Sequence, residues 1–435
     1  MKDNSPSIRR LAALVPLALA SAGSHAADVT PAAQVPPPTD AASAEALDLT
    51  EQGSSLRWLG LDFFPRATAG VRYDNNIFIQ PVNPQRDVIW NLSPALAVTA
   101  GDIALYLPQS VSLSQLRNML AYGLGDEESR PQRYLGIEYQ PDFNFYTDHS
   151  SNNYINQNAL FAAGYRFSRL SLELNQDYQY GTIKDSYVGE LVTSIDYLTR
   201  LKSRYQVTEK TYLEVNGRYE NQHYVESNLS GFQEVRGDGW FNRQVTPHLV
   251  LGAGAAFGYL APQAYFDQPY EQLLVRGMLA ASEKLAAQAS AGVEWRQFDG
   301  NQPNAVNPTF SVAGIYQPSP RTALTLEIHR RELPSPSTPQ NYTYIGVSAG
   351  VRQSLFSRLT VGVSGGYDNV SFDASTAVSY PQRTDNLVSA ALDVSYEIRS
   401  HWTASFYYNY TRDNSNIPTY SYGNSVVGLR LGWRY

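Results

Sequence analysis

The last nine residues of the chain alternate strictly between two kinds of side chain. Val427, Leu429, Leu431, Trp433 and Tyr435 are apolar, and every residue between them is Gly or Arg. Because successive side chains of a β-strand point to opposite faces, one face of this segment is apolar and the other is small or cationic. Such a strand needs partners of the same kind, so we expect a series of similar strands before it.

The same period of two recurs along the chain. It is clear in residues 170–180, 213–220, 285–296 and 324–329, with no competing helical period. Short turns from Ser168 to Ser400 return at intervals of about forty residues, and longer polar loops lie between them. Short connections on one side and long ones on the other are typical of outer-membrane barrels, whose short turns are periplasmic.

Composition excludes several classes of protein. The mean hydropathy of -0.34 is too low for a helical membrane protein, and no long apolar run occurs. Any membrane span must therefore consist of strands. The 31 Tyr residues suit the aromatic girdles of such barrels, and the absence of Cys excludes disulfides and a Cys nucleophile. The net charge of -7 argues against nucleic-acid binding.

Three regions follow from this pattern. Residues 1–26 are predicted to be a signal peptide, because Lys2, Arg9 and Arg10 precede a short apolar run and small residues. Residues 27–57 are predicted to be a flexible, Pro- and Ala-rich periplasmic segment. Residues 58–435 are predicted to form the barrel.

We predict an all-β fold, a transmembrane antiparallel up-and-down β-barrel with tight periplasmic turns and longer extracellular loops. Sixteen strands fit between about residue 133 and the end of the chain, and a hairpin of 63–80 and 86–101 makes 18; 16 strands is the alternative. Residues 102–132 interrupt the rhythm on the periplasmic side. This insertion is either an elongated turn or a segment that enters the lumen and narrows it.

The segment Tyr73-Asp74-Asn75-Asn76-Ile77-Phe78 is the strongest local motif near the start of the barrel. Asp and Asn form turns and also supply oxygen ligands to hard cations. Three consecutive oxygen donors cannot surround a Ca²⁺ ion alone, so we expect a bulge or strand end at the outer rim. No metal site is expected.

The final strand resembles the C-terminal signal by which the outer-membrane assembly machinery recognises a barrel. Together with the YDNNIF element, the repeated turn Phe167-Ser168-Arg169-Leu170 and the high Tyr content, it makes the chain resemble the β-barrel porins that accompany exopolysaccharide gene clusters. This resemblance implies a pore in a Gram-negative outer membrane that exports a polysaccharide. It assigns no functional residues.

Charged residues that alternate with apolar ones should face the lumen, because a charge on the lipid face costs about 2–4 kcal/mol near the midplane. The candidate lining residues are Glu173, Asp177, Glu214, Arg218, Glu294, Arg296, Glu327, Arg430 and Arg434, with Glu220 and His329 beside them. A mixed lining with interleaved Tyr suits the passage of sugars. It equally suits a generic pore or a salt-bridged, closed interior.

An enzyme is not expected, and we predict no catalytic or cofactor-binding residue. Motifs such as H-E-x-x-H and G-x-S-x-G are absent, and His329 is predicted to be a paired surface residue near the outer rim. Polysaccharide export is the leading hypothesis. The alternatives are a diffusion porin for small solutes and a closed, lectin-like surface barrel. The expected partners are outer-membrane lipid, the barrel assembly machinery and periplasmic export components.

Overall fold

The computed structural model describes residues 56–101 and 132–435, except 187, 227, 264–265, 283, 299–303, 339 and 373–381. The predicted signal peptide, nearly all of segment 27–57 and residues 102–131 lie outside these ranges. The proposed domain boundaries and both interpretations of the 102–132 insertion therefore stay predictions.

The described residues form one antiparallel sheet of nineteen strands. The strands are β1 (Leu56–Trp58), β2 (Leu61–Asp74), β3 (Asp87–Gly101), β4 (Arg133–Tyr146), β5 (Tyr154–Arg166), β6 (Leu170–Asp185), β7 (Glu190–Thr208), β8 (Thr211–Tyr224), β9 (Phe232–Thr246), β10 (Leu249–Pro262), β11 (Gln268–Ser282), β12 (Leu285–Arg296), β13 (Ala305–Ser319), β14 (Thr322–Pro334), β15 (Asn341–Leu355), β16 (Leu359–Phe372), β17 (Thr384–Arg399), β18 (Trp402–Ser415) and β19 (Tyr422–Arg434).

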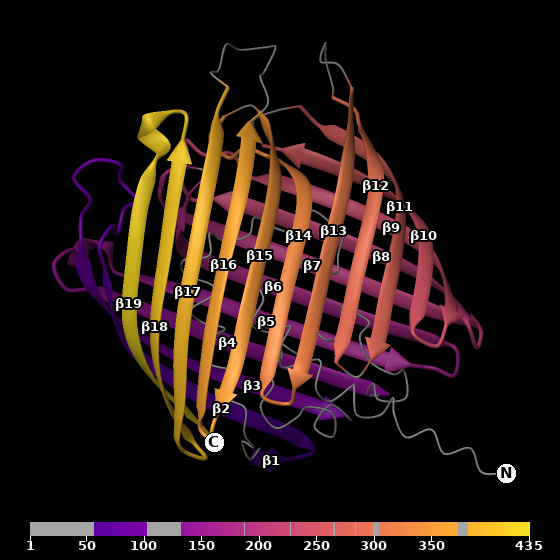
Figure 1. The fold of residues 1–435 in the computed structure, drawn as a ribbon, viewed down its shortest axis with the longest axis horizontal. Helices are drawn as coiled ribbons and strands as arrows, with labels where there is room; N and C mark the ends of the chain where they lie inside the picture. The colour runs from indigo at the N-terminus through magenta and orange to yellow at the C-terminus, as the bar shows by residue number, and fades with distance from the viewer. Residues whose placement is uncertain are drawn as a thin grey trace.

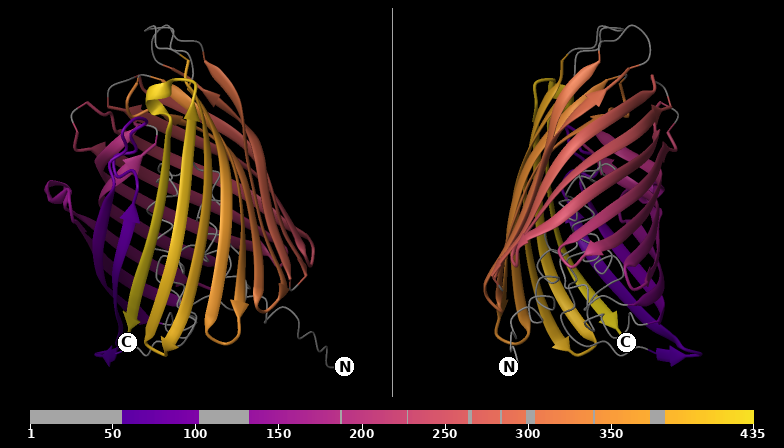
Figure 2. Two further views of the ribbon diagram at one scale, coloured as in Figure 1. Left: turned by 60° about the vertical axis from the view of Figure 1, so that its left-hand side comes forward. Right: turned by 90° about the vertical axis from the view of Figure 1, so that its right-hand side faces the viewer.

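Strands β2 to β19 close into a barrel of eighteen strands, which confirms the predicted fold and strand number (Figure 1). Each strand pairs with the next, and β19 pairs with β2, where Val426 lies opposite Asp74 and Arg434 opposite Arg66. The short β1 pairs with the start of β2. Strands of the near and far walls cross in projection, because all are inclined to the barrel axis (Figure 2).

The two ends of the barrel differ in their connections. Turns of two or three residues join β5 to β6, β7 to β8 and every second pair from there to β17 and β18, and the C-terminus lies at this tight-turn end (Figure 1). Longer segments at the loop end include 75–86, 225–231 and 335–340. The predicted asymmetry between short turns and long loops is thus confirmed.

Helical structure within the described ranges is limited to the 3-10 turns η2 (Ser150–Asn152) and η3 (Pro418–Tyr420). None of the helices in this part of the chain is long and apolar enough to cross a membrane.

The first barrel strand is shorter than predicted. We expected it to continue to residue 80, but β2 ends at Asp74. Asn76 donates its backbone N–H to the Asp74 carboxylate at 3.0 Å, which turns the chain, and Asn75 N donates to Ser425 O of β19 at 3.2 Å. The YDNNIF motif is therefore a strand end at the rim, as its residue types indicated.

Burial alternates along the strands as the sequence does. On β8, Val215 is 63% exposed while Glu214 is 6% exposed. Exposed aromatic side chains gather near both ends of the outer face. Those near the tight-turn end include Tyr165, Phe167, Tyr205, Tyr316, Phe356 and Trp402, and those near the loop end include Tyr73, Trp90, Phe145, Tyr259, Trp295 and Tyr367. An apolar band between two aromatic girdles suits a surface that faces lipid.

Candidate functional site

The predicted lining residues lie on the inner face of the barrel wall. Buried there are Glu173, Glu214, Arg218, Glu294, Arg296, Glu327 and Arg434, and half-buried are Asp177 and Arg430. They are distributed over β6, β8, β12, β14 and β19 and do not form one cluster. Their role in the passage of any solute stays a prediction.

A row of arginines crosses three adjacent strands of this inner wall. Arg200 on β7 lies directly opposite Arg218 on β8, which lies opposite Arg236 on β9. The row continues along the same line of paired residues. Arg236 lies opposite Gly258 on β10, Gly258 lies opposite Tyr270 on β11, and Tyr270 lies opposite Arg296 on β12. Like charges directly opposite one another destabilise a sheet, so this row requires compensation from its surroundings.

Carboxylates on both sides of the row supply that compensation. Arg218 forms an ion pair with Glu220, and its Nη1 lies 3.9 Å from an oxygen of Glu234. Arg236 Nε lies 3.9 Å from Asp238 Oδ1. The side chains of Arg218 and Arg236 are almost completely buried, so these charges depend on one another rather than on water. The register between the strands therefore places charges that are far apart in the sequence beside opposite charges on the inner wall.

Three inward aromatic rings lie over a glycine of a neighbouring strand and also carry a guanidinium. The pairs are Tyr270 with Gly258, Trp240 with Gly254 and Tyr407 with Gly428, and a Cβ on any of these glycines would overlap the ring. A guanidinium lies over each ring: Arg296 over Tyr270, Arg276 over Trp240 and Arg430 over Tyr407, at 4.9, 4.2 and 4.0 Å from the ring centroids. The glycines let the rings lie along the wall, where cation–π contacts stabilise them.

At the loop end, a buried ion pair joins parts of the wall that are not neighbours. Lys184 of β6 pairs with Asp74 of β2, although β3, β4 and β5 lie between them in the sheet. Lys184 Nζ also donates to Asn76 O at 3.1 Å. Asn424 of β19 donates to Asp74 Oδ1 at 2.8 Å. The YDNNIF motif is thus the centre of a network of polar contacts that links β2, β6 and β19.

Further contacts tie distant segments together at the same end. The Ser186 hydroxyl, after β6, is hydrogen-bonded to the Tyr422 hydroxyl of β19, and Arg383 before β17 donates to Ser186 O at 3.2 Å. Ser230 N, after β8, donates to Pro336 O, after β14, at 2.8 Å. We name these contacts and the Lys184–Asp74 pair the mouth latch, because they join non-adjacent strands of the ring.

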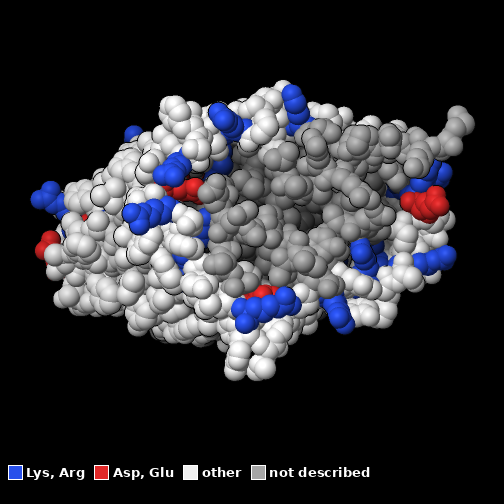
Figure 3. Space-filling view, turned by 90° about the horizontal axis from the view of Figure 1, so that it is seen from below, with Lys and Arg blue, Asp and Glu red and all other residues white. Residues whose placement is uncertain are grey.

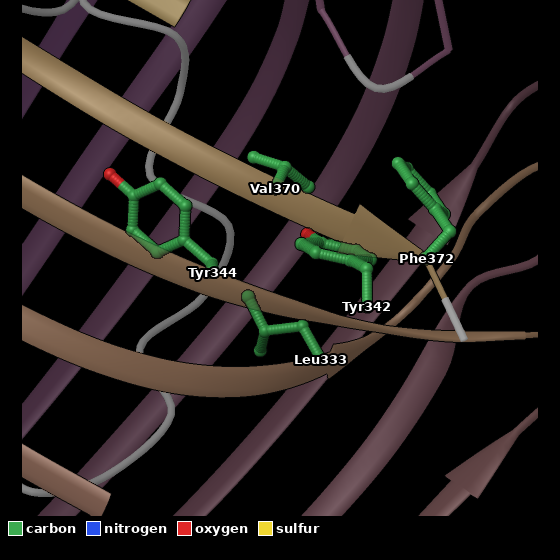
Figure 4. Close-up of a cluster of buried hydrophobic side chains, with 5 residues drawn as sticks. All are labelled: Leu333, Tyr342, Tyr344, Val370 and Phe372. Carbon is green, nitrogen blue, oxygen red and sulfur yellow. The ribbon is translucent and has the colours of Figure 1, made fainter. Parts of the chain in front are cut away.

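Apolar side chains pack on the inner face beside the mouth latch. Figure 4 shows the cluster of Leu333, Tyr342, Tyr344, Val370 and Phe372 from β14, β15 and β16. The rings of Tyr342 and Phe372 lie with centroids 5.2 Å apart.

Loop 75–86 adds buried isoleucines at the same end. Ile77 packs with Ile89 and Tyr146, and Ile79 packs with Leu387 and Tyr422. The loop therefore folds against the inside of the mouth rather than away from the barrel.

His329 faces inward, as the alternation of its strand predicts, and it is paired, but the prediction that it lies at the surface is wrong. Its side chain is buried on the inner face rather than exposed at the rim, with Nδ1 3.3 Å from Glu327 Oε1 and its ring centroid 4.7 Å from that of Tyr344. Among the described residues, no group of three His, Cys, Asp or Glu side chains has the arrangement of a metal site.

Comparisons with known proteins gave one family match and several structural matches. Residues 274–435 match the family described as "Putative beta-barrel porin 2". No curated protein sequence was found that matches the chain.

Several solved structures align with this chain over most of its length, with TM-scores below 0.5. The FrpB iron transporter from Neisseria meningitidis (F3-3 variant) is 9% identical with a TM-score of 0.42; the alignment covers 81% of this chain and 62% of FrpB, so the chain spans less than two thirds of that protein. OccAB4 from Acinetobacter baumannii is 10% identical with a TM-score of 0.44, covering 86% and 98% of the two chains. OpdL from Pseudomonas aeruginosa is 10% identical with a TM-score of 0.44, covering 87% and 99%.

Proposed function

We propose that this chain, a porin-like β-barrel of the outer-membrane type, is the pore through which a polysaccharide leaves the cell. The observation that carries the proposal is the chemistry of the inner wall. A sugar polymer offers hydroxyl groups, which need hydrogen-bonding partners, and ring faces of C–H groups, which pack on planar side chains. The half-buried side chains of the inner wall, such as Asp177, Arg200 and Arg430, offer hydrogen-bonding groups, and the half-buried ring of Tyr154 offers a planar face.

The mouth latch favours polymer export over steady diffusion of small solutes. A diffusion porin works with its mouth permanently open. Here the Lys184–Asp74 pair and the Ser230–Pro336 hydrogen bond hold distant parts of the mouth together. We infer that cargo or a periplasmic partner releases these contacts.

A closed, lectin-like barrel is the second candidate, and the same latch favours it. Such a barrel would bind polysaccharide at the cell surface without passing it. The two candidates differ in what happens to secretion when the protein is lost.

The proposed setting is the outer membrane of a Gram-negative cell, with the tight turns in the periplasm. The exposed apolar band between two aromatic girdles supports contact with lipid. The proposed partners are this lipid, the barrel assembly machinery acting on β19 and periplasmic export components.

The decisive experiment removes the gene and measures surface polysaccharide and the uptake of small solutes. Export predicts that surface polysaccharide is lost while solute uptake is unchanged. Normal secretion with less polysaccharide retained on the cell would support the lectin-like alternative. Unchanged polysaccharide with impaired solute uptake would support a diffusion porin.

A bilayer measurement tests the insertion separately. The purified protein should conduct weakly in a planar bilayer, and deletion of residues 102–132 should increase the conductance if this segment narrows the lumen. Equal conductance of both proteins would contradict that role and favour the elongated-turn interpretation.

A further inference from the structure

Seven tight turns carry a basic residue at one equivalent position. This residue directly precedes the outgoing strand, and the seven are Arg169, Lys210, His248, Lys284, Arg321, Arg358 and His401. In every case its carbonyl oxygen accepts a hydrogen bond from a backbone N–H near the end of the strand that follows the outgoing strand. Examples are Arg169 O from Gln206 N at 2.7 Å and Arg321 O from Ser354 N at 2.8 Å. The seven positions are therefore structurally equivalent.

The backbone does not explain why all seven residues are basic. The chain has 33 Lys and Arg and 6 His among 435 residues, so fewer than one position in ten is basic. The shared hydrogen bond uses a main-chain oxygen, which any residue provides. Directly before β4, Gln132 occupies this position, and its carbonyl oxygen accepts a hydrogen bond from Arg166 N at 2.7 Å. The side chains must therefore serve something other than the turn.

The seven side chains are exposed, and none forms an ion pair with a carboxylate of the described residues. Figure 3 views this end of the molecule, and Lys and Arg side chains are spread round its perimeter rather than gathered on one side. A folded protein partner would contact one side or the entrance. An annular partner fits this distribution better.

Exposed apolar side chains place the basic ring at the edge of the lipid-facing surface. Phe167 precedes Arg169, Phe356 is 81% exposed beside Arg358, and Trp402 follows His401. Aromatic side chains of membrane proteins concentrate at the level of the lipid headgroups. The basic side chains beside them, such as those of Arg169 and Arg358, therefore lie at the depth of the lipid phosphates.

We propose that these seven residues form a ring that binds the phosphates of anionic phospholipid, such as phosphatidylglycerol, in the periplasmic leaflet. The inference uses the outer-membrane placement proposed above but is independent of what passes through the pore. Lys and Arg side chains near a membrane surface attract anionic lipid, and the attraction is screened by salt. The ring would hold the barrel at a defined depth and orientation.

The test reconstitutes the full mature chain in phosphatidylcholine bilayers with spin-labelled phosphatidylglycerol or spin-labelled phosphatidylcholine. The fraction of immobilised label reports the lipid in contact with the barrel. The wild-type protein should prefer phosphatidylglycerol several-fold at low salt and lose the preference at high salt. The combined change Arg169→Gln, Arg321→Gln and Arg358→Gln should reduce the preference most of the way to that of phosphatidylcholine.

The matched control changes the same residue type at the other end of the barrel. Arg86→Gln, Arg330→Gln and Arg412→Gln together should leave the preference intact. The proposal is wrong if the wild-type protein shows no preference, or if the tight-turn variant keeps it. If the tight-turn variant does not assemble, the salt dependence of the wild-type protein is the test. A preference for phosphatidylglycerol that persists at high salt would contradict the proposed ring. A wild-type protein without lipid preference whose tight-turn variant loses surface polysaccharide would point to an acidic protein partner instead.

Discussion

Lys184 on β6 forms a buried ion pair with Asp74 on β2 across three intervening strands. Both side chains are almost inaccessible to water. Breaking such a pair on one side leaves an uncompensated buried charge, whereas removing both charges does not. The pair therefore connects the conformation of the YDNNIF motif to β6, a strand that is not adjacent to β2 in the sheet.

Lys184→Met should loosen the mouth of the barrel, because the Asp74 carboxylate loses its cation and the carbonyl oxygen of Asn76 loses a hydrogen-bond donor. We expect a several-fold increase in conductance in planar bilayers and greater sensitivity of cells to bulky antibiotics. Arg412→Met, at an exposed position near the same end of β18, is the control and should change neither. Unaltered conductance in Lys184→Met would show that the ion pair does not restrict the mouth.

Gly258→Ala should destabilise the barrel, because the new Cβ would overlap the ring of Tyr270. Forcing extra volume into a packed site typically costs about 1–3 kcal/mol. The measurement is the temperature at which the folded, fast-migrating form disappears on a gel. Gly239→Ala is the matched control, since a Cβ there has no neighbour within 4 Å. Equal transition temperatures in both variants would refute the close packing of Tyr270 on Gly258.

Arg218→Met should destabilise the inner wall more strongly, by about 3–5 kcal/mol, because it leaves buried carboxylates without their cation. Glu220 and Glu234 lie directly opposite each other beside Arg218. Adding Glu220→Gln to Arg218→Met should recover part of the loss. Urea unfolding of the single and double variants checks this, and a double variant less stable than the single one would contradict the compensation.

Covalent closure of the mouth latch tests whether the mouth must open. The chain contains no Cys, so Ser230→Cys with Pro336→Cys introduces one isolated cysteine pair where the two backbones are hydrogen-bonded at 2.8 Å. Under oxidising conditions we expect polysaccharide release to fall to the level of the deletion strain and to return after reduction. Ser230→Cys alone is the control. Normal export by the cross-linked protein would exclude opening between these two loops.

Most of the fold could be predicted from local sequence patterns. The alternation in segments such as 285–296 identifies strands, and the regular spacing of the turns gives their number, because each hairpin consumes a similar length of chain. The predicted end of β2 is too late, because Ile77, Phe78 and Ile79 are strand-forming residues, whereas hydrogen bonds from Asn76 to Asp74 and from Asn75 to Ser425 turn the chain before them.

The inward direction of charged residues was predictable from the same alternation, but their partners were not. Glu214 is separated from Arg276 by about sixty residues in the sequence, yet the two form an ion pair on the wall. The burial of His329 could not be predicted, because its position in a strand near the rim does not reveal whether a ring from a neighbouring strand covers it. Tyr344 lies over it from the next strand.

By itself, the sequence determined that the chain forms strands with one apolar and one polar face, how many there are and which connections are short. A period of two and the residue types of turns are local properties. Only the tertiary structure decided that Arg200, Arg218 and Arg236 stand in one row and that Lys184 reaches Asp74. The physical reason is that register between strands and contacts across the closed ring depend on how the whole sheet closes. No single segment encodes that closure.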